Sequence, residues 1–430
     1  LHLRQLALSK SQRKEAIDGI ERLFASITGG YKLIVTEVYQ AGVDGAPDPL
    51  LGPAINRALE QLGFSLLDSY RFYREIEPQL VAESHQLYRL ARHNGLLGSC
   101  VDDSDEAGPP VSIATLYHTS MLLSLTDPFR LAEGEVGLLF DVLVQHAESC
   151  RIIPGSDCSR SSEGVFLIDL GSDALPVPCA GLQLPVTARE PYLLDATMAL
   201  AAVRARLAKT PAKVRMQSPE AMVLRRLLPE TTGAEKRREQ RRPDGRWINL
   251  LLGVEGIHAY LTAAAQKGPA TPAAVRGQPV AEFADCRVLD SSDGGMKLAW
   301  EGGGAGDACV GDLLGILEEQ QGRALLQLGM IRSIRVYREG GMEVGVQLLP
   351  GGLGAVSCYA PEQPAEVAFR ALFMPASEAE QIAATLVAAK GFYAPDRQIL
   401  IDVGGREVRA RAGRRVLDSP VFDRFEFSAE

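Results

Sequence analysis

The hydrophobic pattern of this chain changes its period once, near Arg246, and this change constrains the fold more than any other feature. Before it, apolar residues recur at helical spacing, as in residues 9–30, which end at Gly29 and Gly30. After it, short alternating segments separated by glycine-rich turns predict β-strands. With 430 residues the chain also exceeds one ordinary core. We therefore expect a multidomain α+β protein, in which an all-α domain of helical hairpins precedes an antiparallel β-barrel.

Breaks rich in proline, glycine and charge divide the chain further. We expect a mainly helical interaction domain at 1–209 with a small hairpin near 164–179, a linker at 210–245, a barrel at 246–360 with a helical insertion at 253–279, and a β-rich extension at 361–430 with one helix at Ser377–Ala388. The insertion and the extra C-terminal strands are the two features that a simple barrel does not need.

Composition limits the cellular setting. The apolar fraction of 46% and the charged fraction of 23% are those of a soluble globular protein. The longest apolar stretch, Ile248 to Val254, is far shorter than the ~18 residues that cross a bilayer, so no membrane insertion is expected. The chain starts without methionine or a secretory-type apolar run, which favours a cytoplasmic protein. Seven cysteines without any C-x-x-C pair predict reduced thiols.

Charge and motifs argue against several functions. The net charge of −9 disfavours binding of a nucleic acid polymer, so any anion site must be a local patch. His93, His118 and His146 fall in or beside helical segments, where a structural role is expected. No H-E-x-x-H, G-x-S-x-G or Walker-type motif is present. We expect no catalytic residue, no metal and no cofactor, and a hydrolase or phosphodiesterase is the least favoured alternative.

The basic run from Glu235 to Arg242, EKRREQRR, offers guanidinium groups four residues apart. Two registers fit, Arg237 with Arg241 or Arg238 with Arg242, and the first is favoured. Guanidinium groups match phosphate oxygens and the O6/N7 edge of guanine with two parallel hydrogen bonds. A charge run alone is more often a solvated linker, so this segment needs a second feature to indicate a site.

The second feature is the hexapeptide DSSDGG, which spaces Asp290, Ser292 and Gly295 as D-x-S-x-x-G. By itself this pattern is an ordinary hairpin turn. As part of a site, Asp290 would accept hydrogen bonds from the donor edge of a guanine, Ser292 would bind a neighbouring polar atom, and Gly295 would allow close approach of the backbone. Together the two segments could hold a phosphorylated purine.

The strings CRVLDSSDGGMKLAW, GDLLGILEE, LGMIRSIRV and MEVGVQLL make residues 235–349, about a quarter of the chain, resemble a PilZ domain, the small β-barrel receptor for cyclic di-GMP. The resemblance implies that the ligand is bound by seven residues: Arg237, Arg238, Arg241, Arg242, Asp290, Ser292 and Gly295. It also implies that the linker closes over the ligand. The helix GVEGIHAYLTAAAQ departs from the family pattern and could narrow the pocket, form part of it, or serve as a partner surface.

These expectations combine into a cytoplasmic, non-enzymatic receptor. Binding of cyclic di-GMP would order the linker and change the interaction of the helical domain with a protein partner. The resemblance associates such receptors with bacterial motility, pili and surface attachment. The alternative is a scaffold or adaptor of PilZ-like fold that works without the ligand.

Overall fold

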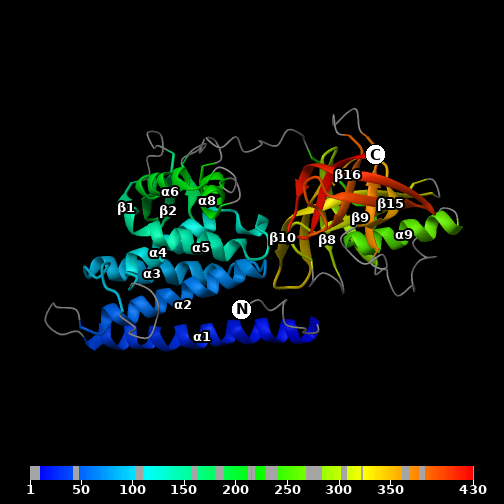
Figure 1. The fold of residues 1–430 in the computed structure, drawn as a ribbon. Helices are drawn as coiled ribbons and strands as arrows, with labels where there is room; N and C mark the ends of the chain where they lie inside the picture. The colour runs from blue at the N-terminus through cyan, green and yellow to red at the C-terminus, as the bar shows by residue number, and fades with distance from the viewer. Residues whose placement is uncertain are drawn as a thin grey trace. The chain divides into compact units, whose positions relative to one another are not determined.

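The computed structural model describes residues 10–41, 48–101, 110–155, 163–179, 188–211, 215, 218–228, 241–267, 283–301, 308–320, 323–360, 368–376 and 383–429. The chain forms two compact units, a helical unit (residues 1–236) and a barrel unit (residues 237–430), drawn in Figure 1. This is the multidomain α+β architecture expected from the change of period, with helices followed by antiparallel barrels.

The helical unit consists of packed helices and a small sheet. Its helices are α1 (Lys10–Ala41), α2 (Leu51–Arg71), α3 (Pro78–His93), α4 (Ile113–Leu125), α5 (Glu135–His146), α6 (Thr197–Lys209) and α8 (Pro219–Leu227), with short 3₁₀ turns at Pro128–Arg130 and Ala147–Ser149. Its strands are β1 (Arg151–Pro154), β2 (Val165–Asp169), β3 (Val177–Pro178) and β4 (Pro191–Asp195), in the order β1-β4-β2-β3. Strands β2 and β3 pair antiparallel where the sequence predicts a hairpin.

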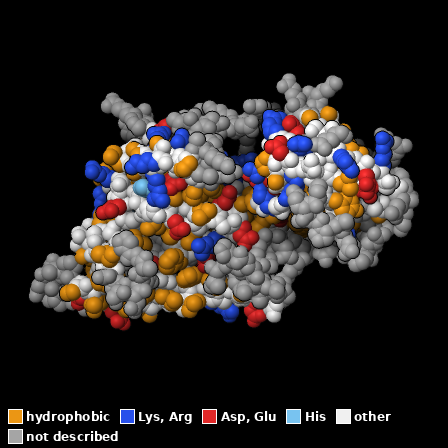
Figure 2. Space-filling view, in the orientation of Figure 1, with side chains coloured by type: hydrophobic (Ala, Val, Ile, Leu, Met, Phe, Trp, Pro, Cys, Tyr) orange, Lys and Arg blue, Asp and Glu red, His pale blue; other side chains and the backbone are white. Residues whose placement is uncertain are grey.

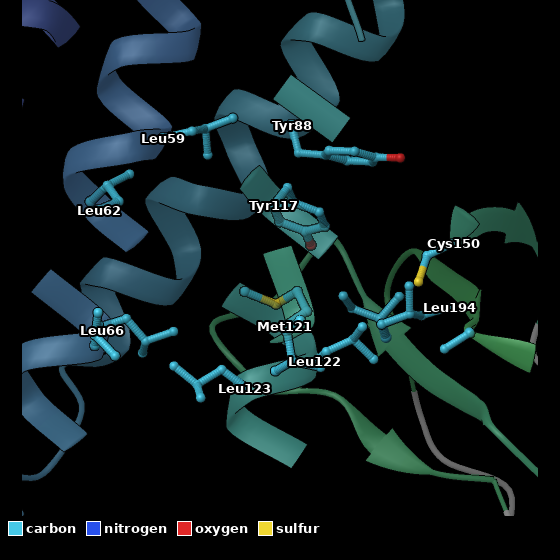
Figure 3. Packing of buried hydrophobic residues seen from close by; sticks show 14 of the residues in the cluster. Leu59, Leu62, Leu66, Tyr88, Tyr117, Met121, Leu122, Leu123, Cys150 and Leu194 are labelled. Carbon is cyan, nitrogen blue, oxygen red and sulfur yellow. The ribbon is translucent and has the colours of Figure 1, made fainter. Parts of the chain in front are cut away.

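One hydrophobic core holds the helical unit together. Leucines of α2 and the aromatic side chains of α3 and α4 meet in it, as Figure 3 shows. The rings of Tyr88 and Tyr117 stack with their centroids 4.1 Å apart. Leu194 of β4 is fully buried in the same cluster, so the sheet and the helices share one core. Each fully buried leucine of this kind contributes about 1.5–3 kcal/mol to folding.

Helix α8 lies inside the expected linker and corrects its bounds. Ser218 caps the helix by accepting a hydrogen bond from the Ala221 N–H at 3.3 Å, and proline occupies the first helical position. Val223 and Leu224 are buried in the core of the helical unit. The helical unit therefore extends beyond residue 209, because α8 buries its apolar face against α5 and α6.

The barrel unit begins with a sheet that closes on itself. Its strands are β5 (Arg242–Pro243), β6 (Trp247–Leu252), β7 (Phe283–Ser292), β8 (Gly295–Trp300), β9 (Leu313–Gln320), β10 (Arg323–Val336) and β11 (Met342–Leu349). They follow the order β5-β7-β6-β9-β10-β11-β8, and the additional pairing of β7 with β8 completes the ring. We call this ring the first barrel.

A second barrel follows directly. Its strands are β12 (Gly354–Tyr359), β13 (Phe369–Met374), β14 (Thr385–Ala389), β15 (Gln398–Val403), β16 (Arg406–Asp418) and β17 (Phe422–Ala429), closed in the order β12-β13-β14-β17-β16-β15. The extension expected at 361–430 is thus part of a complete barrel, which also takes in β12 from before the expected boundary at residue 360. The helix expected at Ser377–Ala388 is wrong for its described residues, because residues 383–384 are not helical and Thr385–Ala389 forms β14. Residues 377–382 lie outside the described residues.

Helix α9 (Gly253–Lys267) is the helical insertion, and it packs against both barrels. Ile257 and Tyr260 share a buried cluster with Leu313 and Leu317 of the first barrel and with Leu372 of the second. Helix α9 therefore joins the two barrels of this unit through one buried cluster. The three roles considered for the insertion stay predictions.

Cysteines follow the expectation in all but one described position. Cys150, Cys286 and Cys358 are buried free thiols, and burial raises the pKa of each to about 12. Cys179, directly after β3, is disulfide-bonded, so the expectation of reduced thiols is wrong there.

Candidate functional site

The DSSDGG segment forms a strand, a turn and a second strand, as its composition predicts. Val288 of β7 faces the barrel interior together with its partner Leu298, and both are fully buried. The pairing then shifts by one residue between Val288 and Asp290, which is a β-bulge. Without the bulge, Asp290 would point inward like Val288, two residues before it. The bulge instead places Asp290 beside its partner Lys297 on the outer face, with a side chain that is about a quarter exposed.

The basic run reaches this hairpin through the short strand β5. Arg242 pairs with Ser291, and Pro243 pairs with Asp290. The neighbouring Arg241 then forms an ion pair with Asp290, with Nη1 2.5 Å from Oδ1. The structure therefore joins two motifs that lie 49 residues apart in sequence.

The other three arginines of the predicted site do not make this contact in the described residues. Arg242 is exposed on β5. Arg237 and Arg238 lie outside the described residues, so the choice between the two arginine registers stays a prediction. Among the described residues, Arg241 is the arginine that contacts the second motif through its side chain.

A network around Asp244 fixes the chain just after the arginines. Its Oδ1 accepts the N–H groups of Gly245 and Arg246 at 2.8 and 3.1 Å, and its Oδ2 accepts the Ser291 hydroxyl at 3.0 Å. Burial alone would raise the pKa of Asp244, but these hydrogen bonds and the nearby Arg246 guanidinium lower it overall. Arg246 also bridges Asp244 to Glu318 of β9, at 2.8 and 3.1 Å.

Sequence reasoning did not single out these anchoring residues. The available signal was the Pro-Asp-Gly sequence after the arginine run, since Asp favours turns in which its side chain binds the backbone of the next residues. The anchor matters because it holds Arg241 at a fixed distance from the hairpin.

Two glycines, Gly295 and Gly345, leave part of the outer face of the sheet without side chains. An added Cβ at Gly295 would lie 2.5 Å from the Val346 carbonyl oxygen of β11, which is closer than Cβ atoms approach other heavy atoms in proteins. Gly345 of β11 lies between Lys297 of β8 and Ser333 of β10, and a Cβ there would collide with the Ser333 side chain. The close approach at Gly295 is thus to the protein's own backbone.

Charged and polar side chains line this glycine patch. Lys297 Nζ lies 2.6 Å from Glu343 Oε1, and the Tyr337 hydroxyl donates to Glu343 Oε2 at 3.2 Å. Burial and the nearby Glu343 carboxylate raise the pKa of Tyr337. The Ser292 hydroxyl donates to the Gly295 carbonyl at 3.3 Å. A flat, anionic molecule could lie on the patch, since the Arg241 guanidinium and the Lys297 ammonium flank two residues without side chains, Gly295 and Gly345.

The described residues contain no group of three or more His, Cys, Asp or Glu side chains placed to hold a metal ion. In the same part of the chain, every helix is too short or too polar to span a bilayer.

Comparisons with known proteins point to one kind of receptor. Residues 1–155 match the family described as "Cyclic-di-GMP receptor FimW, N-terminal domain", and residues 355–429 match "FimW C-terminal beta-barrel domain". Neither match includes residues 241–297, where the candidate site lies. A protein of Pseudomonas aeruginosa named "Cyclic-di-GMP receptor FimW" is 24% identical over 473 residues, which cover 93% of this chain and 76% of that protein. The chain is therefore similar to FimW at both ends, and resembles it over nearly its full length.

Proposed function

We propose that this protein is a receptor for cyclic di-GMP and that the first barrel is a PilZ-type domain that holds the ligand. The names of the similar protein and of the N-terminal family support this proposal. The observation that carries it is the ion pair of Arg241 with Asp290, which brings the two motif segments together on the outer face of the barrel.

In this proposal the ligand replaces contacts that the residues now make with one another. The Arg241 guanidinium turns from Asp290 to a phosphate or to the O6/N7 edge of a guanine, and Asp290 accepts the N–H donors of a guanine. Ser292 binds a neighbouring polar atom, and Arg237, Arg238 and Arg242 supply further cations. Arg241 and Asp290 are each about 30% exposed, so breaking their pair costs little, about 0–1 kcal/mol.

Binding would act on a partner rather than on the dinucleotide itself. We propose that the segment between α8 and β5, which carries Arg237, Arg238 and Arg241, becomes ordered over the ligand and thereby changes how the helical unit interacts with a protein partner, without catalysis and in the cytoplasm. The process that we propose for it is motility, pilus function or surface attachment in a bacterium.

Titration calorimetry with cyclic di-GMP tests the proposal. We expect the wild-type chain to bind and Arg241→Gln and Asp290→Asn each to weaken binding about 5- to 150-fold, since a good bidentate pair contributes about 1–3 kcal/mol. Arg409→Gln is the matched control, because Arg409 is an exposed arginine on β16 of the second barrel. Absence of heat with the wild-type chain would refute the assignment.

Gly295 is unsuitable as a test residue. Because its substitution would press a Cβ against the Val346 carbonyl, a loss of binding could reflect a distorted barrel.

The alternative, a scaffold that works without the ligand, has one observation in its favour. Arg241, Asp290, Ser292 and Gly295 all make contacts within the protein, so the motif also has a structural reason to exist. In that case the wild-type chain would give no heat with the dinucleotide.

A further inference from the structure

The helical unit contains an open cavity of about 570 Å³. Its lining comes from the end of α1, the second half of α3 and the start of β4: Tyr39, Gln86, Arg89, Leu90, Arg92, His93, Glu190 and Tyr192. We call it the α3 groove. Its volume lies in the range of ligand and peptide pockets. Leu90 and Tyr192 also pack against the core, so the floor of the groove is part of the rigid fold.

The polar groups of the groove are mostly hydrogen-bond donors. Arg89, Arg92, Gln86 and His93 offer N–H groups, and Glu190 is the carboxylate among the lining residues. Arg89 is already engaged, since its Nη1 lies 3.3 Å from Glu190 Oε2 and 3.4 Å from the Leu170 carbonyl oxygen. The charge that remains for an incoming group is therefore that of Arg92, with the imidazole of His93 beside it.

Among the described residues, Arg92 has an aromatic neighbour and no ion-pair partner. Its guanidinium carbon lies 4.5 Å from the centroid of the Tyr192 ring, a cation–π contact that fixes its position. Its Nη1 is shielded and has no hydrogen-bond partner among the described residues, where a buried guanidinium normally finds an acceptor. The negative end of the helix dipole stabilises a cation in the last turn of α3, but it does not provide a hydrogen-bond acceptor for the Nη1 hydrogens of Arg92.

The position of Arg92 at the C-terminal end of α3 favours a carboxylate over a phosphate as its partner. Arg92 and His93 lie in the last turn of α3, where backbone carbonyl groups point outward and repel negative charge. Helix N-termini, with free N–H groups, are the usual receptors for phosphate. A carboxylate, with one charge and two oxygens at the spacing of a guanidinium fork, suits this place better. Tyr39, which is 51% exposed, and Leu90 offer apolar surface next to it.

We propose that the α3 groove binds a peptide segment of a partner protein, with an Asp or Glu side chain on Arg92 and an adjacent apolar side chain against Tyr39 and Leu90. A small rotation of the guanidinium over the Tyr192 ring presents two N–H groups to the carboxylate. The proposal concerns the helical unit alone and does not depend on binding of cyclic di-GMP.

A random peptide library displayed on phage, selected on the full chain, tests this site. We expect enriched peptides to share an Asp or Glu beside an aromatic or aliphatic residue.

Fluorescence anisotropy with the synthetic consensus peptide then measures its affinity. Arg92→Gln should reduce this affinity at least about tenfold, and so should Asn or Gln in place of the acidic residue of the peptide. Tyr39→Ala, a surface change that leaves the core intact, should also weaken binding. Arg204→Gln on α6 is the control, because Arg204 is an exposed arginine of the same unit outside the groove.

Three results would overturn the proposal. The first is a consensus without acidic residues, or no consensus. The second is a consensus peptide that binds the Arg92→Gln and Tyr39→Ala chains as tightly as the wild type. The third is displacement of the peptide by inorganic phosphate at concentrations where acetate has no effect, which would assign the groove to a phosphate group.

Discussion

His118 shows how burial decides the charge of a single side chain. The residue is 3% exposed on α4, and its Nδ1 lies 3.2 Å from the Ala147 carbonyl oxygen, so the Nδ1–H donates to it. Its Nε2 is buried and has no partner among the described residues. Protonation of Nε2 would therefore create a buried N–H donor without an acceptor. Burial accordingly lowers the pKa of His118 from its ordinary value of 6.5 to about 4.

The stability of the helical unit should consequently fall in mild acid. Because the folded-state pKa lies below the unfolded value, the contribution of His118 is complete above pH 6.5 and is lost as the pH falls towards 4. The full loss is about 3–4 kcal/mol, because the pKa falls from 6.5 to about 4 and one pKa unit corresponds to about 1.4 kcal/mol. Urea unfolding followed by circular dichroism, at several pH values between 7.5 and 4.5, measures it.

His118→Leu should reduce this pH dependence by about one proton. Part of the dependence should remain, because burial also lowers the pKa of His85 and His146. The same pH dependence in the wild type and the variant would show that His118 titrates normally in the folded protein.

The candidate site was predictable from its residue types, and its geometry was not. D-x-S-x-x-G placed Asp290 and Ser292 on a hairpin because Asp, Ser and Gly favour turns. The hydrophobic periodicity of the sequence does not reveal the bulge that turns Asp290 outward or the hydrogen bonds of Asp244, since both depend on how β7 pairs with its neighbours. Likewise, Arg92 and Tyr192 lie a hundred residues apart in sequence, and only the fold of the helical unit brings the guanidinium onto the ring.

Burial of a strand on both faces explains why a helix was predicted where β14 lies. In β14, Leu386 and Ala388 face the interior of the second barrel, whereas Val387 packs into the cluster around α9. All three are fully buried. The alternation that marks an ordinary strand is therefore missing, and a short apolar run of this kind cannot be distinguished from a buried helix by its period. In α8 the cues were present, since Ser218 and Pro219 form a helix start, but the basic residues that follow suggested a linker.

Helix α9 should couple the folding of the two barrels. Ile257 is fully buried in the cluster that both barrels share, so Ile257→Ala removes contacts on both sides and should cost about 2–5 kcal/mol. Hydrogen exchange measured by mass spectrometry should show that β9 and β13 lose protection together. Thr262→Ala, on the exposed side of the same helix, is the control and should change the free energy of unfolding little. Loss of protection in one barrel alone would show that the barrels fold independently.

The division of the chain into two compact units separates two proposed activities. The proposed peptide groove lies within residues 39–192, and the described part of the proposed dinucleotide site lies within residues 241–297. Each unit has its own hydrophobic core, so each should fold when expressed alone. The segment between α8 and β5 contains the first arginines of the basic run and belongs with the barrel fragment in any such experiment.

Two fragments test this division. We expect residues 229–430 to bind cyclic di-GMP with an affinity within about threefold of the full chain, because all seven predicted ligand residues lie in this fragment. Residues 1–228 should give no heat with the dinucleotide and should bind the consensus peptide as the full chain does. The control is the circular dichroism spectrum of each fragment, which should be helical for residues 1–228 and strand-rich for residues 229–430.

If the folded barrel fragment failed to bind while the full chain bound, the helical unit would have to supply part of the dinucleotide site. If ligand binding to the full chain also changed its affinity for the peptide, and the fragments showed no such change, the segment that joins the units would be the element that couples them.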